Sequence, residues 1–147
     1  MTSTGLTVAP GIAVVLRDGE GRVLLHRRHV GSGWAPVSGH LEPGESIAAG
    51  LRREVDEETG LTMLGIRLVG VYSDPDFQII AFPDGRRVQF VTTLFIATTP
   101  NDSDLSGSDE ATAWDWFYPH ALPDRLLPYA ERWLADALAT YGEPVVS

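Results

Sequence analysis

A chain of 147 residues in which 44% of the side chains are apolar and 21% are charged has the composition of one soluble globular domain. It contains no cysteine, which excludes disulfide bonds and thiolate metal sites. No apolar run reaches the ~20 residues that span a bilayer. Residues 1–10 lack the basic and apolar regions of a signal peptide, so we expect a cytoplasmic protein without a membrane partner.

The net charge of −9 is concentrated in two segments of the chain. Residues 42–58 carry six acidic side chains and two arginines, and residues 101–115 carry five acidic side chains and no basic one. Concentrated negative charge suits a metal cation better than the phosphate backbone of a nucleic acid. We therefore expect no nucleic-acid partner.

The first part of the chain is predicted to form a β-hairpin followed by a long loop. Residues 11–16 and 22–28 are apolar runs that a turn-rich stretch separates, which is typical of two paired strands. Residues 29–45 are rich in glycine, proline and serine, so we expect a structured loop. Loops of this length in small domains are often functional.

Residues 46–59 are predicted to form a helix. Ser46 or Glu45 can cap its start, and Gly60 suits the left-handed position at its end. Apolar residues at helical spacing predict one buried face: they are Ala48, Leu51 and Val55.

The rest of the chain is predicted to form strands and a final helix. The expected elements are one or two strands in 61–73, a hairpin of 77–82 and 86–98, a polar loop at 99–110 and a strand at 111–117. An apolar stripe after Pro128 predicts a helix that ends at Gly142. This order predicts one α/β domain over residues 1–147, with a mixed sheet covered by two helices.

The predicted helix carries three carboxylates on a second face, since Glu54, Glu57 and Glu58 are three and four residues apart. Like charges at this spacing destabilise a helix by roughly 0.2–0.5 kcal/mol per pair. A divalent cation reverses the sign of that interaction, and carboxylate oxygens suit Mg²⁺ or Mn²⁺. The alternative is a solvated face with Arg52 and Arg53 as counter-charges.

The residues around this helix follow a longer pattern. Gly39 is followed after five residues by Glu45, and after seven more by the run REVDEETGL of residues 53–61. This spacing matches the Nudix box at every specified position, and the chain resembles the Nudix (MutT-like) hydrolase superfamily. One departure is the segment before Gly39, which reads PVSG where many members have Pro-Gly-Gly.

The resemblance implies an α/β/α sandwich and an enzyme that hydrolyses a nucleoside diphosphate linked to another moiety. In that family water attacks a phosphorus of the pyrophosphate with the help of Mg²⁺ or Mn²⁺. Such chemistry depends mainly on positioning and on charge stabilisation.

Carried onto this chain, the resemblance assigns metal binding to four residues: Glu54, Glu57, Glu58 and the carbonyl of Gly39. Glu45 and Arg53 resemble the pair that braces the loop against the helix, and Arg53 orients the carboxylates. Glu54, Glu57 and Arg53 are therefore the catalytic candidates on the helix. Which glutamate is the general base stays open.

Two residues outside the box are further candidates. Glu110 precedes a predicted strand and resembles the carboxylate that adds a metal ligand or the base in several subfamilies. Its alternatives are a solvated loop acid, or Asp109 in the same role. Trp34 lies just before the box and could stack on a base, or it could pack in the core.

Substrate contacts are also candidates at Arg27, Arg28 and Tyr72. Opposite strand faces diverge, so at most one of the two arginines points at the site, and either could instead be an exposed side chain. Tyr72 and the pair Arg86–Arg87 are candidates for contact with the substrate or with a second copy in a homodimer.

The function predicted is Mg²⁺-dependent hydrolysis of the pyrophosphate of a small nucleotide, a (d)NTP or a nucleoside diphosphate derivative. The alternatives are an ADP-ribose or nucleotide-sugar pyrophosphatase and a non-catalytic nucleotide sensor. Sensor members often lose box carboxylates, and all are present here. The absence of a basic stripe argues against a third alternative, the removal of RNA caps.

Overall fold

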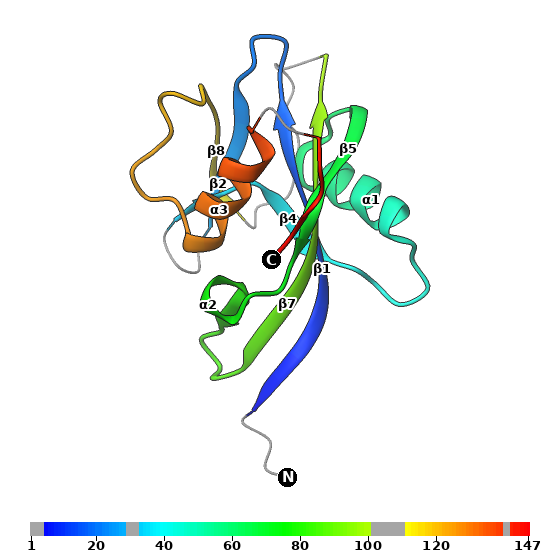
Figure 1. The fold of residues 1–147 in the computed structure, drawn as a ribbon, viewed down its shortest axis with the longest axis vertical. Coiled ribbons are helices and arrows are strands. Elements are labelled where there is room, and N and C mark those ends of the chain that lie inside the picture. Colours follow the sequence, from blue (N-terminus) through cyan, green and yellow to red (C-terminus); the bar gives the residue numbers. More distant parts are fainter. Residues whose placement is uncertain (1–4, 29–32, 101–110, 140–141) are drawn as a thin grey trace.

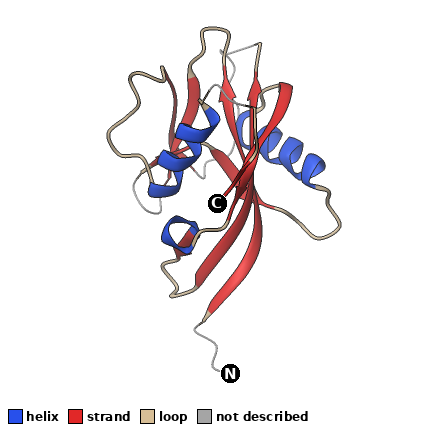
Figure 2. Cartoon of the chain, in the orientation of Figure 1, coloured by secondary structure: helices blue, strands red, loops and turns tan. Residues whose placement is uncertain are grey.

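The chain folds into a mixed β-sheet with helices on both faces (Figures 1 and 2). The computed structural model describes residues 5–28, 33–100, 111–139 and 142–147. Its strands are β1 (Leu6–Arg17), β2 (Val23–Arg28), β3 (Trp34–Ala35), β4 (Val37–His40), β5 (Leu64–Tyr72), β6 (Ile79–Ala81), β7 (Arg87–Thr98), β8 (Ala111–Phe117) and β9 (Val145–Val146). Its helices are α1 (Ile47–Thr59), α2 (Pro75–Gln78) and α3 (Pro128–Ala137).

The long strand β1 organises the sheet. It pairs in parallel with β7 along its whole length, from Leu6 opposite Arg87 to Arg17 opposite Thr98. On its other edge it pairs antiparallel with both β4 and the start of β2. The main path of the sheet is β3-β2-β1-β7-β5-β9, with β4, β6 and β8 attached to β1, β7 and β2. The predicted mixed sheet is confirmed.

Alternate residues of β1 supply two separate cores because successive side chains of a strand point to opposite faces. Ala13 and Val15 belong to the core beneath α3, whereas Val14 and Leu16 belong to the core beneath α1. Figure 1 shows α1 and α3 on opposite sides of the sheet. The predicted α/β class and its sandwich arrangement are therefore confirmed. None of the helices in the described residues is long and apolar enough to cross a membrane.

Four local features differ from the sequence predictions. The expected loop at 29–45 contains β3 and β4, which pair with β2 and β1. The expected strand at 77–82 begins as α2, because Asp74 caps the backbone N–H of Asp76 and Pro75 occupies the first turn. Helix α3 ends at Ala137 instead of reaching Gly142. The short strand β9 pairs with β5 and was not predicted.

Candidate active site

Helix α1 has the ends that its sequence predicts, but Ala48 of the expected buried face is exposed. The Ser46 hydroxyl accepts a hydrogen bond from the Ala49 N–H at 3.1 Å, and Gly60 closes the helix in the left-handed conformation. Leu51 and Val55 are buried against the sheet. The carboxylate face is therefore turned towards β4 and the loop that precedes the helix.

Arg53 is the centre of this face. Its Nε and Nη2 donate to the two carboxylate oxygens of Glu45 at 2.6 and 3.0 Å, and Nη1 donates to Glu54 at 3.0 Å and Glu57 at 3.3 Å. Nη2 also donates to the backbone oxygen of His40 at 2.9 Å. The hydrogen bond to Glu45 is the main reason that the pKa of Arg53 is raised. One guanidinium thus ties α1 to the loop and to β4.

Glu45 is held on both sides. Besides the fork to Arg53, its Oε1 accepts the backbone N–H of Glu42 at 3.0 Å, and these hydrogen bonds lower the pKa of Glu45. Gly50 lets the carboxylate lie this close to the helix, since a Cβ there would come within 2.8 Å of Glu45 Oε1. Glu45 is therefore held by hydrogen bonds beside Arg53, and its role as a brace of the site stays a prediction.

Glu54 lies against the backbone of Gly39. A Cβ built on Gly39 would overlap the Glu54 carboxylate, so only glycine leaves room for this approach. Burial raises the pKa of Glu54, the hydrogen bond from Arg53 opposes that shift, and the charges of Glu58 and Glu57 add to it. The Glu54 side chain is 13% exposed. A largely covered carboxylate with two acidic neighbours is a place where a cation is favoured.

The chemistry of this donor set fits Mg²⁺ or Mn²⁺, which prefer carboxylate and backbone oxygens. The Glu54 carboxylate lies against the backbone of Gly39, so oxygens of both residues are close together. The Glu57 side chain is 58% exposed and can rotate. In the described part of the chain, no three His, Asp or Glu side chains are already close enough together to hold an ion. Glu54 and Glu57 converge instead on Arg53, which occupies the space between them.

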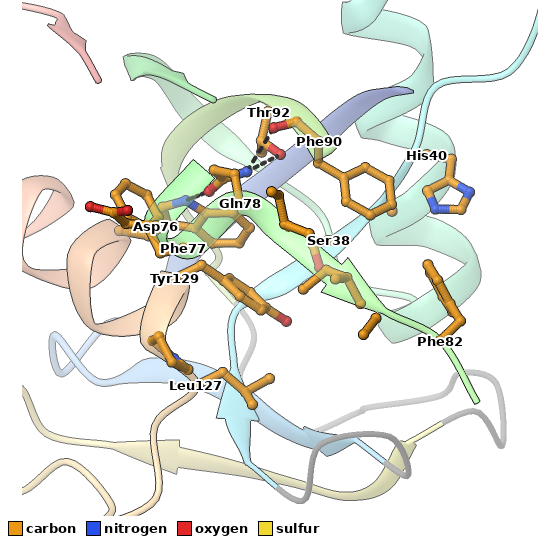
Figure 3. A pocket seen from close by; sticks show the side chains of 16 residues that line it. Ser38, His40, Asp76, Phe77, Gln78, Phe82, Phe90, Thr92, Leu127 and Tyr129 are labelled. Carbon is orange, nitrogen blue, oxygen red and sulfur yellow. Dashed lines mark hydrogen bonds between the residues drawn. The ribbon is translucent and has the colours of Figure 1, made fainter. Parts of the chain in front are cut away.

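A cavity of about 640 Å³ lies on the side of β4 opposite to the carboxylate cluster of α1 (Figure 3). It is lined by the strand β4, by α2 and β6, by Phe90 and Thr92 of β7, and by the start of α3. Ser38, Gly39 and His40 line it, so β4 is shared by the cavity and the carboxylate cluster. His40 stacks on Phe90 at this junction, with ring centres 5.1 Å apart.

The sequence alone does not predict this cavity, because its walls come from four segments that are far apart in the chain. The available signal was the run of rings after Pro75: Phe77 and Phe82 both line the cavity. Arg86 lies over the Phe82 ring at 4.9 Å and pairs with Asp84 at 2.7 Å, so it lies beside the cavity.

Two of the secondary candidates, Trp34 and Arg27, contact each other. Trp34 packs edge-on against Phe117 at 5.1 Å and lies under the Arg27 guanidinium, and neither Trp34 nor Arg27 is among the described lining residues. Arg27 is exposed. The side chain of Arg28 lies outside the described part of the chain. Glu110 also lies outside the described residues, as does Asp109.

Tyr72 is corrected by the structure. Its side chain has 0% exposure, and its hydroxyl donates to Asp136 Oδ2 at 2.7 Å. Burial is the main reason that the pKa of Tyr72 is raised. A side chain with no exposed surface cannot contact a substrate or a second subunit, so Tyr72 joins β5 to α3 instead.

Comparison with known proteins gives matches over most of the chain. A family model described as the NUDIX domain matches residues 7–139. An RNA pyrophosphohydrolase of Novosphingobium aromaticivorans is 30% identical, over 87% of this chain and 88% of its own. A MutT-like protein of Streptomyces ambofaciens is 33% identical, over 99% and 86%. The crystal structure of a MutT NUDIX hydrolase from Burkholderia pseudomallei has the same fold, with a TM-score of 0.71, 21% identity and coverage of 88% and 98%.

Proposed function

The chain belongs to the Nudix domain family, and from this premise we propose that it hydrolyses the pyrophosphate of a small nucleotide with Mg²⁺ or Mn²⁺. Its relatives include an RNA pyrophosphohydrolase and a putative 8-oxo-dGTP diphosphatase, and this chain is a hydrolase that acts on phosphoanhydride bonds of nucleoside phosphates. The observation that carries the proposal is the Arg53 hub, which gathers Glu45, Glu54 and Glu57 next to Gly39.

The residues that would hold the metal are Glu54, Glu57, Glu58 and the carbonyl of Gly39. When bound, the metal would neutralise charge on the pyrophosphate and polarise the attacking water. Arg53 orients the carboxylates, and Glu45 holds Arg53 in place by a two-point hydrogen bond. Removal of the proton from water falls to a glutamate of this set, and Glu110 stays a prediction as an added carboxylate.

The cavity supports a nucleotide as the substrate. It opens beside Gly39 and His40, where the phosphates would lie, and its walls carry the rings of Phe77, Phe82 and Phe90. Flat apolar walls suit a nucleobase, which presents two aromatic faces. The metal cluster and the cavity would therefore hold the two parts of one nucleotide.

A second candidate substrate is the 5′ end of an RNA. It is favoured by the Novosphingobium relative, which is an RNA pyrophosphohydrolase. The net charge of −9 argues against a long RNA contact, because phosphate backbones bind to basic surfaces. A small nucleotide therefore remains our first choice. A homodimer and a cytoplasmic location stay predictions from the sequence, the former testable by light scattering.

One panel of substrates tests the proposal. The eight common (d)NTPs, ADP-ribose and a short 5′-triphosphorylated RNA are incubated with the protein and Mg²⁺, and the products are resolved by chromatography. We expect cleavage within the phosphate chain of at least one small nucleotide, at a higher kcat/KM than for the RNA. Protein carrying Glu57→Gln controls for a contaminating enzyme. The absence of turnover on every compound would overturn the proposal in favour of a binding module.

A further inference from the structure

The floor of the cavity is held by one buried amide, that of Gln78. Its Nε2 donates to the backbone oxygen of Phe90 at 3.1 Å and to Thr92 Oγ1 at 3.0 Å. Its Oε1 accepts the indole N–H of Trp133 at 3.0 Å. The Gln78 side chain is almost fully buried, and Figure 3 shows its bonds to β7.

The orientation of this amide is fixed by its partners. An indole nitrogen can only donate and a backbone oxygen can only accept, so the oxygen of Gln78 must face Trp133 and the nitrogen must face Phe90. Gln78 therefore joins three elements, α2, β7 and α3, at one point. It also engages the hydrogen-bonding groups of Trp133, Phe90 and Thr92 that would otherwise face the cavity.

The charges of the wall define what the cavity can hold. Among the described residues that line it, Asp76 is the only Asp, Glu or Arg. A phosphate would meet an acidic side chain there and no arginine, so the charged part of a nucleotide belongs on the side of Gly39 and α1. The remaining surface consists mainly of aromatic and aliphatic side chains, which suit an uncharged planar group.

We propose that Gln78 is a positioning residue that makes the cavity tolerant of different bases. This proposal about Gln78 rests on the proposed function, in which the cavity receives the base of the nucleotide. With the amide in place, the floor offers rings and few open hydrogen-bonding groups, and stacking on a ring distinguishes bases weakly. Without the amide, the Trp133 N–H and the Phe90 carbonyl are exposed to the base edge, and hydrogen bonds distinguish bases strongly.

Binding of nucleoside monophosphates in the presence of EDTA tests this inference without depending on hydrolysis. AMP, GMP, CMP and UMP are titrated into the wild-type protein and followed by calorimetry. We expect all four to bind, with dissociation constants that lie within about tenfold of one another. Gln78→Ala should widen that spread beyond about tenfold, since one matched or unmatched buried hydrogen bond changes affinity by that order.

Gln89→Ala is the matched control, because Gln89 donates from β7 to the Ser73 carbonyl at 2.8 Å and does not line the cavity. Gln89→Ala should keep the wild-type spread of the four dissociation constants. A loss of structure alone would weaken all four ligands equally and leave the spread unchanged. If Gln78→Ala does not fold, Gln78→Ser, whose side chain is also too short to reach Trp133 and Phe90, replaces it in the same comparison.

Three results would overturn the inference: a wild-type preference above about 100-fold for one base, an unchanged spread in folded Gln78→Ala, or no binding of any monophosphate. The substrate panel reports separately on the proposed function. Turnover of nucleotides together with any of these three results would leave the hydrolase standing and remove only the role of Gln78.

Discussion

The contact between Gly39 and Glu54 constrains both residues. The backbone of β4 and the buried carboxylate of α1 come together only because Gly39 has no side chain. Arg53 then holds the same carboxylate from the other side at 3.0 Å. These box residues are thus parts of one packed unit, in which the addition of a single methyl group should displace the Glu54 carboxylate.

Gly39→Ala tests this packing. The added methyl group would displace the Glu54 carboxylate, and a misplacement of about 1 Å can lower turnover by about 100-fold. We expect a loss of that order in kcat with the protein still folded by circular dichroism. Gly19→Ala is the control, since a Cβ at Gly19 meets nothing within 4 Å. Wild-type kcat in Gly39→Ala would show that the position of Glu54 is not important.

The neighbouring carboxylates of α1 should differ sharply in importance. Glu57→Gln and Glu58→Gln keep the shape of the side chain and remove an anionic metal ligand. We expect each to lower kcat by more than the about 10–100-fold that follows loss of an outer partner of a metal ligand. Asp56→Asn, an exposed position outside the specified pattern, should keep kcat near wild type. Equal damage from Asp56→Asn and Glu57→Gln would mean that the functional face of α1 is misassigned.

The residues of the box were predictable because they lie close together in the sequence and match the residue types and spacing of the Nudix box. Ser46, Glu45, Arg53 and Gly60 lie where the sequence predicts. Tyr72 was not predictable, because its burial depends on α3, whose residue Asp136 lies 64 positions further along the chain. A polar hydroxyl gives no sign in the sequence of whether its partner is a substrate or a distant core residue.

Among the helices and strands, α1 was the most predictable, because its capping residues and the spacing of its apolar residues indicate the same helix. The short strands β3, β4 and β9 were missed, since two to four residues carry little periodicity and their stability comes from partners elsewhere in the sheet. Helix α2 was missed because its apolar residues also fit a strand, and the Asp74–Pro75 start decided in favour of a helical turn.

Ser46→Ala tests the start of α1. The variant loses the hydrogen bond from the Ala49 N–H, and removal of such a cap lowers the free energy of unfolding by about 1 kcal/mol. Urea denaturation measures the change. Ser46→Asp keeps an acceptor at the cap and should retain most of the wild-type stability. Equal losses in both variants would mean that the hydroxyl does not cap the helix.

Tyr72→Phe tests the link between β5 and α3. Loss of a hydrogen bond to the Asp136 carboxylate should lower the free energy of unfolding by about 1.5–3 kcal/mol. Arg132→Met removes a second, exposed partner of Asp136 and should cost about 0.5 kcal/mol or less. Thermal unfolding of the two variants compares the losses. A smaller loss for Tyr72→Phe than for Arg132→Met would contradict the assignment of Tyr72 to the core.

At the level of the whole molecule, the carboxylate cluster and the cavity lie on different faces of the sheet. Glu54, Glu57 and Arg53 of α1 lie on one face, the cavity lies on the face of α3, and β4 joins them. The sequence predicts the sheet class and both helices, but not the full-length parallel pairing of β1 with β7, because parallel partners are distant in the chain. The cavity depends on that pairing, which places Phe90 and Thr92 of β7 one strand away from β4, across β1.

We expect nucleotide hydrolysis to depend on a metal ion that the carboxylates of α1 hold. The most direct test is the turnover of the best nucleotide of the panel in Mg²⁺, in excess EDTA, and after Mn²⁺ is added beyond the chelator. We expect turnover to fall to background in EDTA and to return with Mn²⁺ in the wild type, but not in Glu57→Gln. Full turnover in excess EDTA would contradict the claim.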